Sequence, residues 1–168
     1  MLSTWLILTI LKIFILPFLI VLINFINEDG LVTYCNSRFS FCIKYPKSFV
    51  KQPSPENGDG LIFLSKDKET EILAFGSLVI EGLDPLEQEY KLSTNDINLT
   101  YKFITKKYFI ISGTTKAGKI VYRKTCKRKI NYMGEPGTYV FQTLMITYPT
   151  SQINIYETFC SYISKSLN

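Results

Sequence analysis

The apolar N-terminal segment constrains this chain more than any other feature of its sequence. Residues 5–26 lack the polar face that a core helix of a soluble domain shows, so the segment indicates export. As a signal peptide it has an h-region at 13–23, and as an uncleaved anchor it is long enough to cross a bilayer. Both interpretations stay open. The polar residues and the proline that break the apolar run are Thr9, Lys12, Pro17 and Asn24.

The charges beside this segment predict its orientation. Lys12 lies on its amino-terminal side, whereas Glu28 and Asp29 follow it, so the rest of the chain faces away from the cytoplasm. We therefore expect an exported protein, in the periplasm or at the outer face of the inner membrane. The N-terminal part, 1–27, is followed by a body at 31–168 whose length is typical of one domain.

The sequence contains no histidine. This excludes Ser-His-Asp triads, a histidine general base and histidine metal ligands. The chain has 19 Lys and Arg against 14 Asp and Glu, which gives a net charge of +5. We assign no catalytic residue, no metal ligand and no cofactor.

Four cysteines agree with export, because an even number in a small secreted domain indicates disulfide bridges. Cys35 and Cys42 flank a turn between two alternating segments, so we expect them to pair across a hairpin. Cys126 lies in a strand-like run and Cys160 on the apolar stripe of the last predicted helix, and we expect the second bridge between these two. Three pairings are formally open. A four-cysteine zinc site is disfavoured because paired C-x2-C knuckles are missing.

Strand patterns dominate the body. Leu31–Cys35 and Phe39–Lys44 alternate around a turn and predict a half-buried hairpin. Asn-Gly and Asp-Gly pairs mark a loop at 53–60, and a further turn is expected at 134–137. The other predicted strands are 61–65, 70–80, 98–104, 107–114, 120–129 and 138–147.

Two helices are predicted. Asp84 as N-cap, Pro85 at the first helical position and Glu87 three residues after the cap begin the first helix. The second is expected to open with Thr150 or Ser151 as cap, and its apolar residues step by three and four. The whole pattern predicts an α+β fold, an antiparallel β-sheet flanked by helices. The apolar face of the second helix comprises Ile153, Tyr156, Cys160, Ile163 and Leu167.

Several strand, turn and helix residues together form a recognisable pattern. They are Tyr34, Asn36, Arg38, Phe39, Phe41, Ile43, Tyr45, Pro46, the run 57–60, Ser112, Gly113, Ile120, Tyr122, Lys124, Tyr148, Pro149, Tyr156 and the run 163–167. This pattern resembles small exported bacterial proteins of the PsbP/Mog-like superfamily (DcrB-type), over about 31–168. The resemblance implies an α/β/α sandwich. It also implies a non-catalytic accessory or binding role, since the superfamily includes a photosystem subunit, a Ran-binding factor and bacterial envelope proteins.

Two loops imitate ligand-binding motifs. Residues 113–120 nearly spell a P-loop, but Ile120 stands where a hydroxyl must reach Mg²⁺, and a strand follows instead of a helix. Residues 57–60 resemble part of a calcium loop, but Pro55 and Lys66 stand where acidic ligands are required. We interpret both segments as turns.

One cluster of cations stands out between residues 123 and 129. Strand alternation sends Arg123, Lys127 and Lys129 to one face and Lys124 and Arg128 to the other. A solvated strand end is the simple interpretation. The functional interpretation is a patch for an anionic partner, such as a phospholipid headgroup, an acidic protein or a polyanion. Nucleic acid is disfavoured because the body is exported.

The leading hypothesis is therefore an exported, non-catalytic envelope protein that binds a protein partner or a membrane surface. A sharper variant is an immunity-type inhibitor of a toxin in the same compartment. The competing class is a hydrolase that uses only Asp and Glu, which needs two converging carboxylates. The spacing brings no pair together among the candidates Glu56, Asp59, Glu87 and Glu89.

Overall fold

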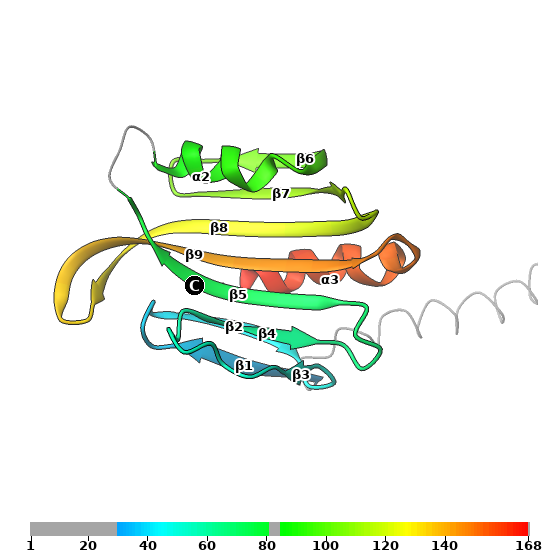
Figure 1. Ribbon diagram of the computed structural model, residues 1–168, viewed down its shortest axis with the longest axis horizontal. Coiled ribbons are helices and arrows are strands. Elements are labelled where there is room, and N and C mark those ends of the chain that lie inside the picture. The colour runs from blue at the N-terminus through cyan, green and yellow to red at the C-terminus, as the bar shows by residue number, and fades with distance from the viewer. Residues whose placement is uncertain (1–29, 81–84, 168) are drawn as a thin grey trace, which may run out of the picture. The chain divides into compact units, whose positions relative to one another are not determined.

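The computed structural model describes residues 30–80 and 85–167 (Figure 1). The predicted signal peptide or anchor, 1–27, lies outside the described residues. From Val32 onward the chain forms one compact unit with a buried core. Among the described residues, no helix is both long enough and apolar enough to span a membrane.

Nine strands are described, and they form two antiparallel sheets. β1, Leu31–Asn36, and β2, Phe41–Pro46, make the predicted hairpin. The other strands form one sheet in the order β3-β4-β5-β9-β8-β7-β6. Their bounds are β3 Val50–Lys51, β4 Gly60–Leu64, β5 Glu71–Leu78, β6 Ile97–Ile104, β7 Tyr108–Thr115, β8 Lys119–Tyr132 and β9 Glu135–Pro149.

Helices cover both faces of the large sheet. α2 spans Pro85–Thr94, and α3 spans Ile153–Lys165 after a short 3-10 turn, η3, at Thr150–Gln152. Neighbouring residues of a strand point to opposite faces, and on β8 Arg123 bonds Glu89 of α2 while Lys124 bonds Ser164 of α3. The two helices therefore lie on opposite faces, and the α+β fold is confirmed.

The β1–β2 hairpin packs beside α3 on the same face of the sheet. Its alternating residues Phe39, Phe41 and Ile43 are buried, as predicted. Gln142 of β9 donates its side-chain amide to the carbonyls of Phe39 and Ser40. The Phe39 ring lies against Gly76 of β5, where a Cβ atom would come within 2.1 Å of the ring. Glycine at position 76 is therefore required by this close approach.

The second predicted bridge is not formed. Cys35 and Cys42 are joined between β1 and β2, whereas Cys126 and Cys160 are separate buried thiols. Cys160 contacts Tyr148, whose partner on β8 is Ile120. Cys126 lies six residues beyond Ile120 on β8, about 20 Å along the strand, whereas a disulfide requires Cα atoms within about 7 Å. The prediction of a 126–160 bridge is therefore wrong.

The β8–β9 hairpin is longer than predicted. The turn lies at Met133 and Gly134, both with positive φ, and not at residues 134–137. Pro136 belongs to β9 and pairs with Asn131 of β8, next to an irregularity in the register at Ile130 and Asn131. α3 also starts differently, because Gln152 occupies the N-cap position and makes no side-chain cap.

Candidate functional site

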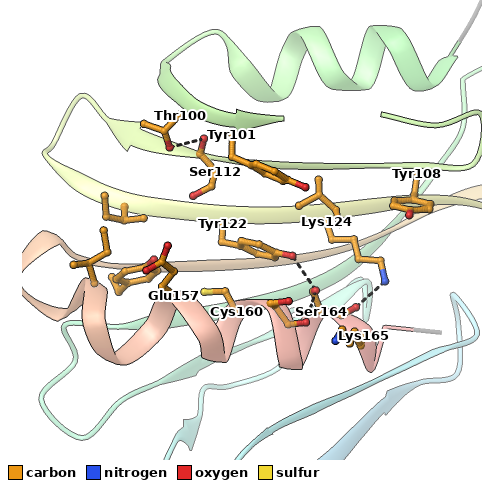
Figure 2. Close-up of a pocket in the computed structure, with 15 residues that line it drawn as sticks. Thr100, Tyr101, Tyr108, Ser112, Tyr122, Lys124, Glu157, Cys160, Ser164 and Lys165 are labelled. Carbon is orange, nitrogen blue, oxygen red and sulfur yellow. Dashed lines mark hydrogen bonds between the residues drawn. The ribbon is translucent and has the colours of Figure 1, made fainter. Parts of the chain in front are cut away.

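A cavity of about 800 Å³ opens between α3 and strands β6, β7 and β8 (Figure 2). It exists because, within the large sheet, α3 packs on β9 and β8 and leaves β6 and β7 largely uncovered on this face. One tyrosine from each of four strands lines it, and we call it the tyrosine cavity. These residues are Tyr101 of β6, Tyr108 of β7, Tyr122 of β8 and Tyr148 of β9.

Hydrogen bonds fix the wall that α3 contributes. The Tyr122 hydroxyl donates to Ser164 Oγ at 2.9 Å, and Ser164 Oγ donates to the Ser161 carbonyl at 3.0 Å. Burial raises the pKa of Tyr122, so the phenol stays protonated and keeps its donor. This side of the cavity is therefore held in one geometry.

Lys124 lies at the C-terminal end of α3. Its ammonium donates to the Ser164 carbonyl at 2.7 Å and lies 5.8 Å from the centre of the Tyr108 ring. Burial lowers the pKa of Lys124. Because the carbonyls at a helix C-terminus carry partial negative charge, this lysine stabilises the end of α3. Its main role is structural, although its stem forms part of the cavity wall.

The Cys160 thiol is buried in the wall of the cavity. Only 1% of this residue is exposed, and burial raises the pKa of its thiol to about 12. A nucleophilic cysteine needs the opposite, an accessible thiolate with a lowered pKa. Burial also raises the pKa of the neighbouring Tyr148. These groups supply packing and polarity and lack the features of a reactive centre.

The charged residues that line the cavity do not form an acid pair. Glu157 is the one carboxylate among the lining residues, and Lys124 and Lys165 are the cations. In the part of the chain that the structure describes, no three side chains of His, Cys, Asp or Glu gather as a metal site requires. The lining offers aromatic faces with hydroxyl groups at their edges, which suits binding of an amphipathic group.

The outer wall of the cavity is the edge strand β6. Among the described strands it pairs with β7 alone, so alternate residues turn their N–H and C=O groups away from the sheet. Three large side chains on this strand are about half exposed: Tyr101 at 52%, Phe103 at 45% and Ile104 at 45%. The Phe103 ring lies 5.9 Å from that of Tyr108 and extends the aromatic wall to the edge. An open strand edge thus adjoins an aromatic cavity.

The structure separates the residues of the predicted basic cluster. They alternate between the two faces of β8, as the sequence indicates. The Arg123 side chain is largely buried, and its guanidinium is 2.5 Å from a carboxylate oxygen of Glu89. Lys124 belongs to the tyrosine cavity. Lys127, Arg128 and Lys129 lie at the base of the extended β8–β9 hairpin. Lys127 and Lys129 share one face of this hairpin, and Arg128 lies on the other.

The two imitation motifs are turns, as predicted. Residues 115–119 connect β7 and β8, with Gly118 at φ 77°. In the loop before β4, the Asn57 amide donates to Asp59, while Arg38 donates to the Asn57 carbonyl. The side chains of this loop are thus bonded to each other.

Sequence reasoning missed the tyrosine cavity. Its four tyrosines are spread over residues 101–148, and no local motif joins them. They meet because they occupy the same face of four consecutive strands of the sheet, which requires the strand order and register. The sequence shows only that each tyrosine alternates with residues that point to the opposite face of its own strand. It does not show that the four tyrosines share one face of the sheet.

Comparison with known proteins identifies the fold. No protein-family model matches this sequence, and no curated protein matches it. Among solved structures it is similar to the solution structure of cyanobacterial PsbP (CyanoP) from Synechocystis sp. PCC 6803, with a TM-score of 0.56 and 9% sequence identity. The match covers 85% of this chain and 94% of that protein. The predicted PsbP-like resemblance is therefore confirmed at the level of the fold.

Proposed function

We propose that this protein is an exported, non-catalytic binding module that holds an extended segment of a protein partner beside β6. The observation that carries this proposal is the open edge of β6 next to the tyrosine cavity. A segment that pairs with this edge gains main-chain hydrogen bonds. Every second side chain of the added strand then points to the face on which the cavity opens.

The chemistry of the lining supports such an occupant. Tyrosine buries a large area at low entropic cost and still offers a hydroxyl, which is why it is frequent in protein-binding surfaces. Tyr101 and Phe103 are about half exposed, and they stand on the strand at the edge of the described sheet. An apolar or aromatic side chain of the incoming segment fits this environment best.

The Cys35–Cys42 bridge supports a location outside the cytoplasm, because such bridges persist in oxidising compartments. Together with the apolar segment 5–26, it favours the periplasm or the outer face of the inner membrane. A toxin that enters this compartment is one protein that could supply the bound segment. In that case the protein would act as an immunity-type inhibitor. A hydrolase that uses only acids is less well supported, because Glu157 has no second carboxylate beside it in the cavity.

Site-specific photo-crosslinking in living cells tests the proposal. Phe103 is replaced with p-benzoylphenylalanine, and the matched control carries the same probe at Val50, which lies on the opposite edge strand β3 and is 56% exposed. We expect Phe103 to link to one protein through one contiguous segment, and Val50 not to link to it. The additional change Tyr101→Ala should weaken the link.

Two outcomes contradict the proposal. Equal crosslinking from both edges means that β6 is not a specific site. A linked species that adds only the mass of a small molecule assigns the cavity to a small amphipathic ligand instead of a protein segment.

A further inference from the structure

The extended β8–β9 hairpin projects beyond the sheet as a two-stranded arm (Figure 1). β7 pairs with β8 only as far as Cys126, and β5 pairs with β9 only as far as Val140. Single backbone bonds then hold the base, from Lys127 to Lys107 and from Val79 to Tyr139. Between these positions none of the described strands lies beside the two strands, and we call residues 127–139 the arm.

The arm is nevertheless held in place. The Tyr132 hydroxyl near its tip accepts bonds from Arg38 Nε at 2.9 Å and from Arg38 Nη2 at 2.6 Å. The Tyr132 ring also packs against Phe39, with ring centres 5.3 Å apart. Because Phe39 is buried against the sheet, the arm is tied to the core of the molecule. Its surface is preorganised for a ligand.

One face of the arm holds two cations over one ring. The ammonium groups of Lys127 and Lys129 lie 5.7 Å and 5.5 Å from the centre of the Tyr139 ring. Neither lysine makes an ion pair within residues 30–80 and 85–167. Two like charges gathered in this way repel each other, and an anion between them removes the repulsion. Arg128 is exposed on the other face, and Glu135 is the one acid of the arm.

The tip of the arm is apolar. Met133 is 79% exposed, although the chain turns there with positive φ, a conformation in which Asn or Gly is less strained. Met133 lies four residues beyond Lys129, about 13 Å along an extended strand. When Met133 meets the acyl boundary, the Lys129 side chain, about 6 Å long, brings its ammonium to about 7 Å from that boundary. The headgroup zone is about 5–8 Å thick, so the ammonium lies within it.

We propose that the arm docks on an anionic phospholipid surface, with Lys129 on a headgroup phosphate, Lys127 adding positive charge behind it, and Met133 in the interface. The charges favour this occupant over a neutral bilayer, because each Lys or Arg near an anionic leaflet strengthens binding. The exposed methionine beside them favours a surface with an apolar layer beneath its charges. This inference does not depend on the function of the tyrosine cavity.

Vesicle co-sedimentation of the compact body, residues 30–168, tests the proposal without the apolar segment 5–26. The vesicles contain phosphatidylcholine alone or with about 30% phosphatidylglycerol. We expect binding only to the anionic vesicles, and its loss when NaCl is raised to about 0.5 M. Lys129→Glu should lower the partition coefficient at least about fivefold. The matched control Lys66→Glu, an exposed lysine in the β4–β5 turn, changes the net charge equally and should have an effect of less than about twofold.

A second variant reports on the tip. Trp5 is the one tryptophan of the sequence and is not part of the tested body, so Met133→Trp gives a unique fluorophore. Its emission should shift to the blue on anionic vesicles and stay unchanged with neutral ones. Equal losses for Lys129→Glu and Lys66→Glu overturn the proposal, as does equal binding to both kinds of vesicle. Binding to poly-glutamate but not to anionic vesicles also overturns it, and assigns the arm to an acidic protein.

Discussion

The ion pair between Arg123 and Glu89 gives the sharpest stability prediction. Its Nη2–Oε1 distance is 2.5 Å, and the two side chains are only 13% and 23% exposed. Arg123 also donates to Thr125 Oγ1 at 3.0 Å and lies 5.8 Å and 5.9 Å from the ring centres of Phe75 and Phe109. Glu89→Ala therefore leaves a guanidinium among aromatic rings without its counter-charge.

The expected loss follows from this burial. Removal of one partner of a buried pair costs about 3–5 kcal/mol, and the residual exposure of Glu89 reduces this to about 2–3 kcal/mol. For a slope of about 2 kcal/mol per molar urea, the midpoint of unfolding falls by about 1–1.5 M. The assay is urea unfolding followed by far-UV circular dichroism, with the disulfide intact.

A control on the same helix separates the cost of leaving a buried charge unpaired from the cost of losing an exposed ion pair. Lys91 lies 3.3 Å from Glu87, but their side chains are 68% and 51% exposed, so Lys91→Ala should cost less than about 0.5 kcal/mol. The double variant Arg123→Met with Glu89→Ala should be more stable than Glu89→Ala alone, because no buried charge remains. If Glu89→Ala costs no more than Lys91→Ala, the assignment of Arg123 to the core and not to a binding surface is refuted.

Three further predictions concern the core. Gly76→Ala should destabilise the fold by at least about 1–3 kcal/mol, because the new methyl group meets the Phe39 ring, whereas Gly30→Ala, with nothing within 4 Å, should be neutral in the same urea titration. Because the pKa of Cys160 is about 12 in the folded state and about 9 when unfolded, stability should fall as pH rises from 9 to 12, and Cys160→Ala should flatten this fall in melting curves; an unchanged slope contradicts the burial argument. Mass spectrometry of the native non-reduced protein should find one disulfide and two thiols that react with iodoacetamide only after unfolding, at Cys126 and Cys160, whereas a second bridge contradicts the described fold.

The elements that the sequence predicted well are those fixed by local patterns. The β1–β2 hairpin follows from alternation around a turn, and its bridge follows from two cysteines on adjacent strands. α2 begins with a proline and an early glutamate, which are local signals. The separation of Arg123 from Lys124 needs only the period of a strand.

The elements that it missed depend on contacts between distant segments. The position of α3 along the strands decides whether Cys160 can reach Cys126. The periodicity of the sequence does not give the distance between these two residues. The arm was predicted to end early because Pro136 and Gly137 usually mark a turn. The tyrosine cavity depends on register across four strands, from Tyr101 to Tyr148.

Amide hydrogen exchange of β6 tests the central claim most directly. The segment that crosslinks to residue 103 is synthesised as a peptide, and exchange is followed residue by residue by NMR spectroscopy with and without it. If the segment adds a strand to the sheet, amides at alternate positions of β6 that face away from β7 should gain protection, while those of the opposite edge strand β3 should not change. Unchanged exchange along β6 in the bound protein would contradict strand addition at this edge.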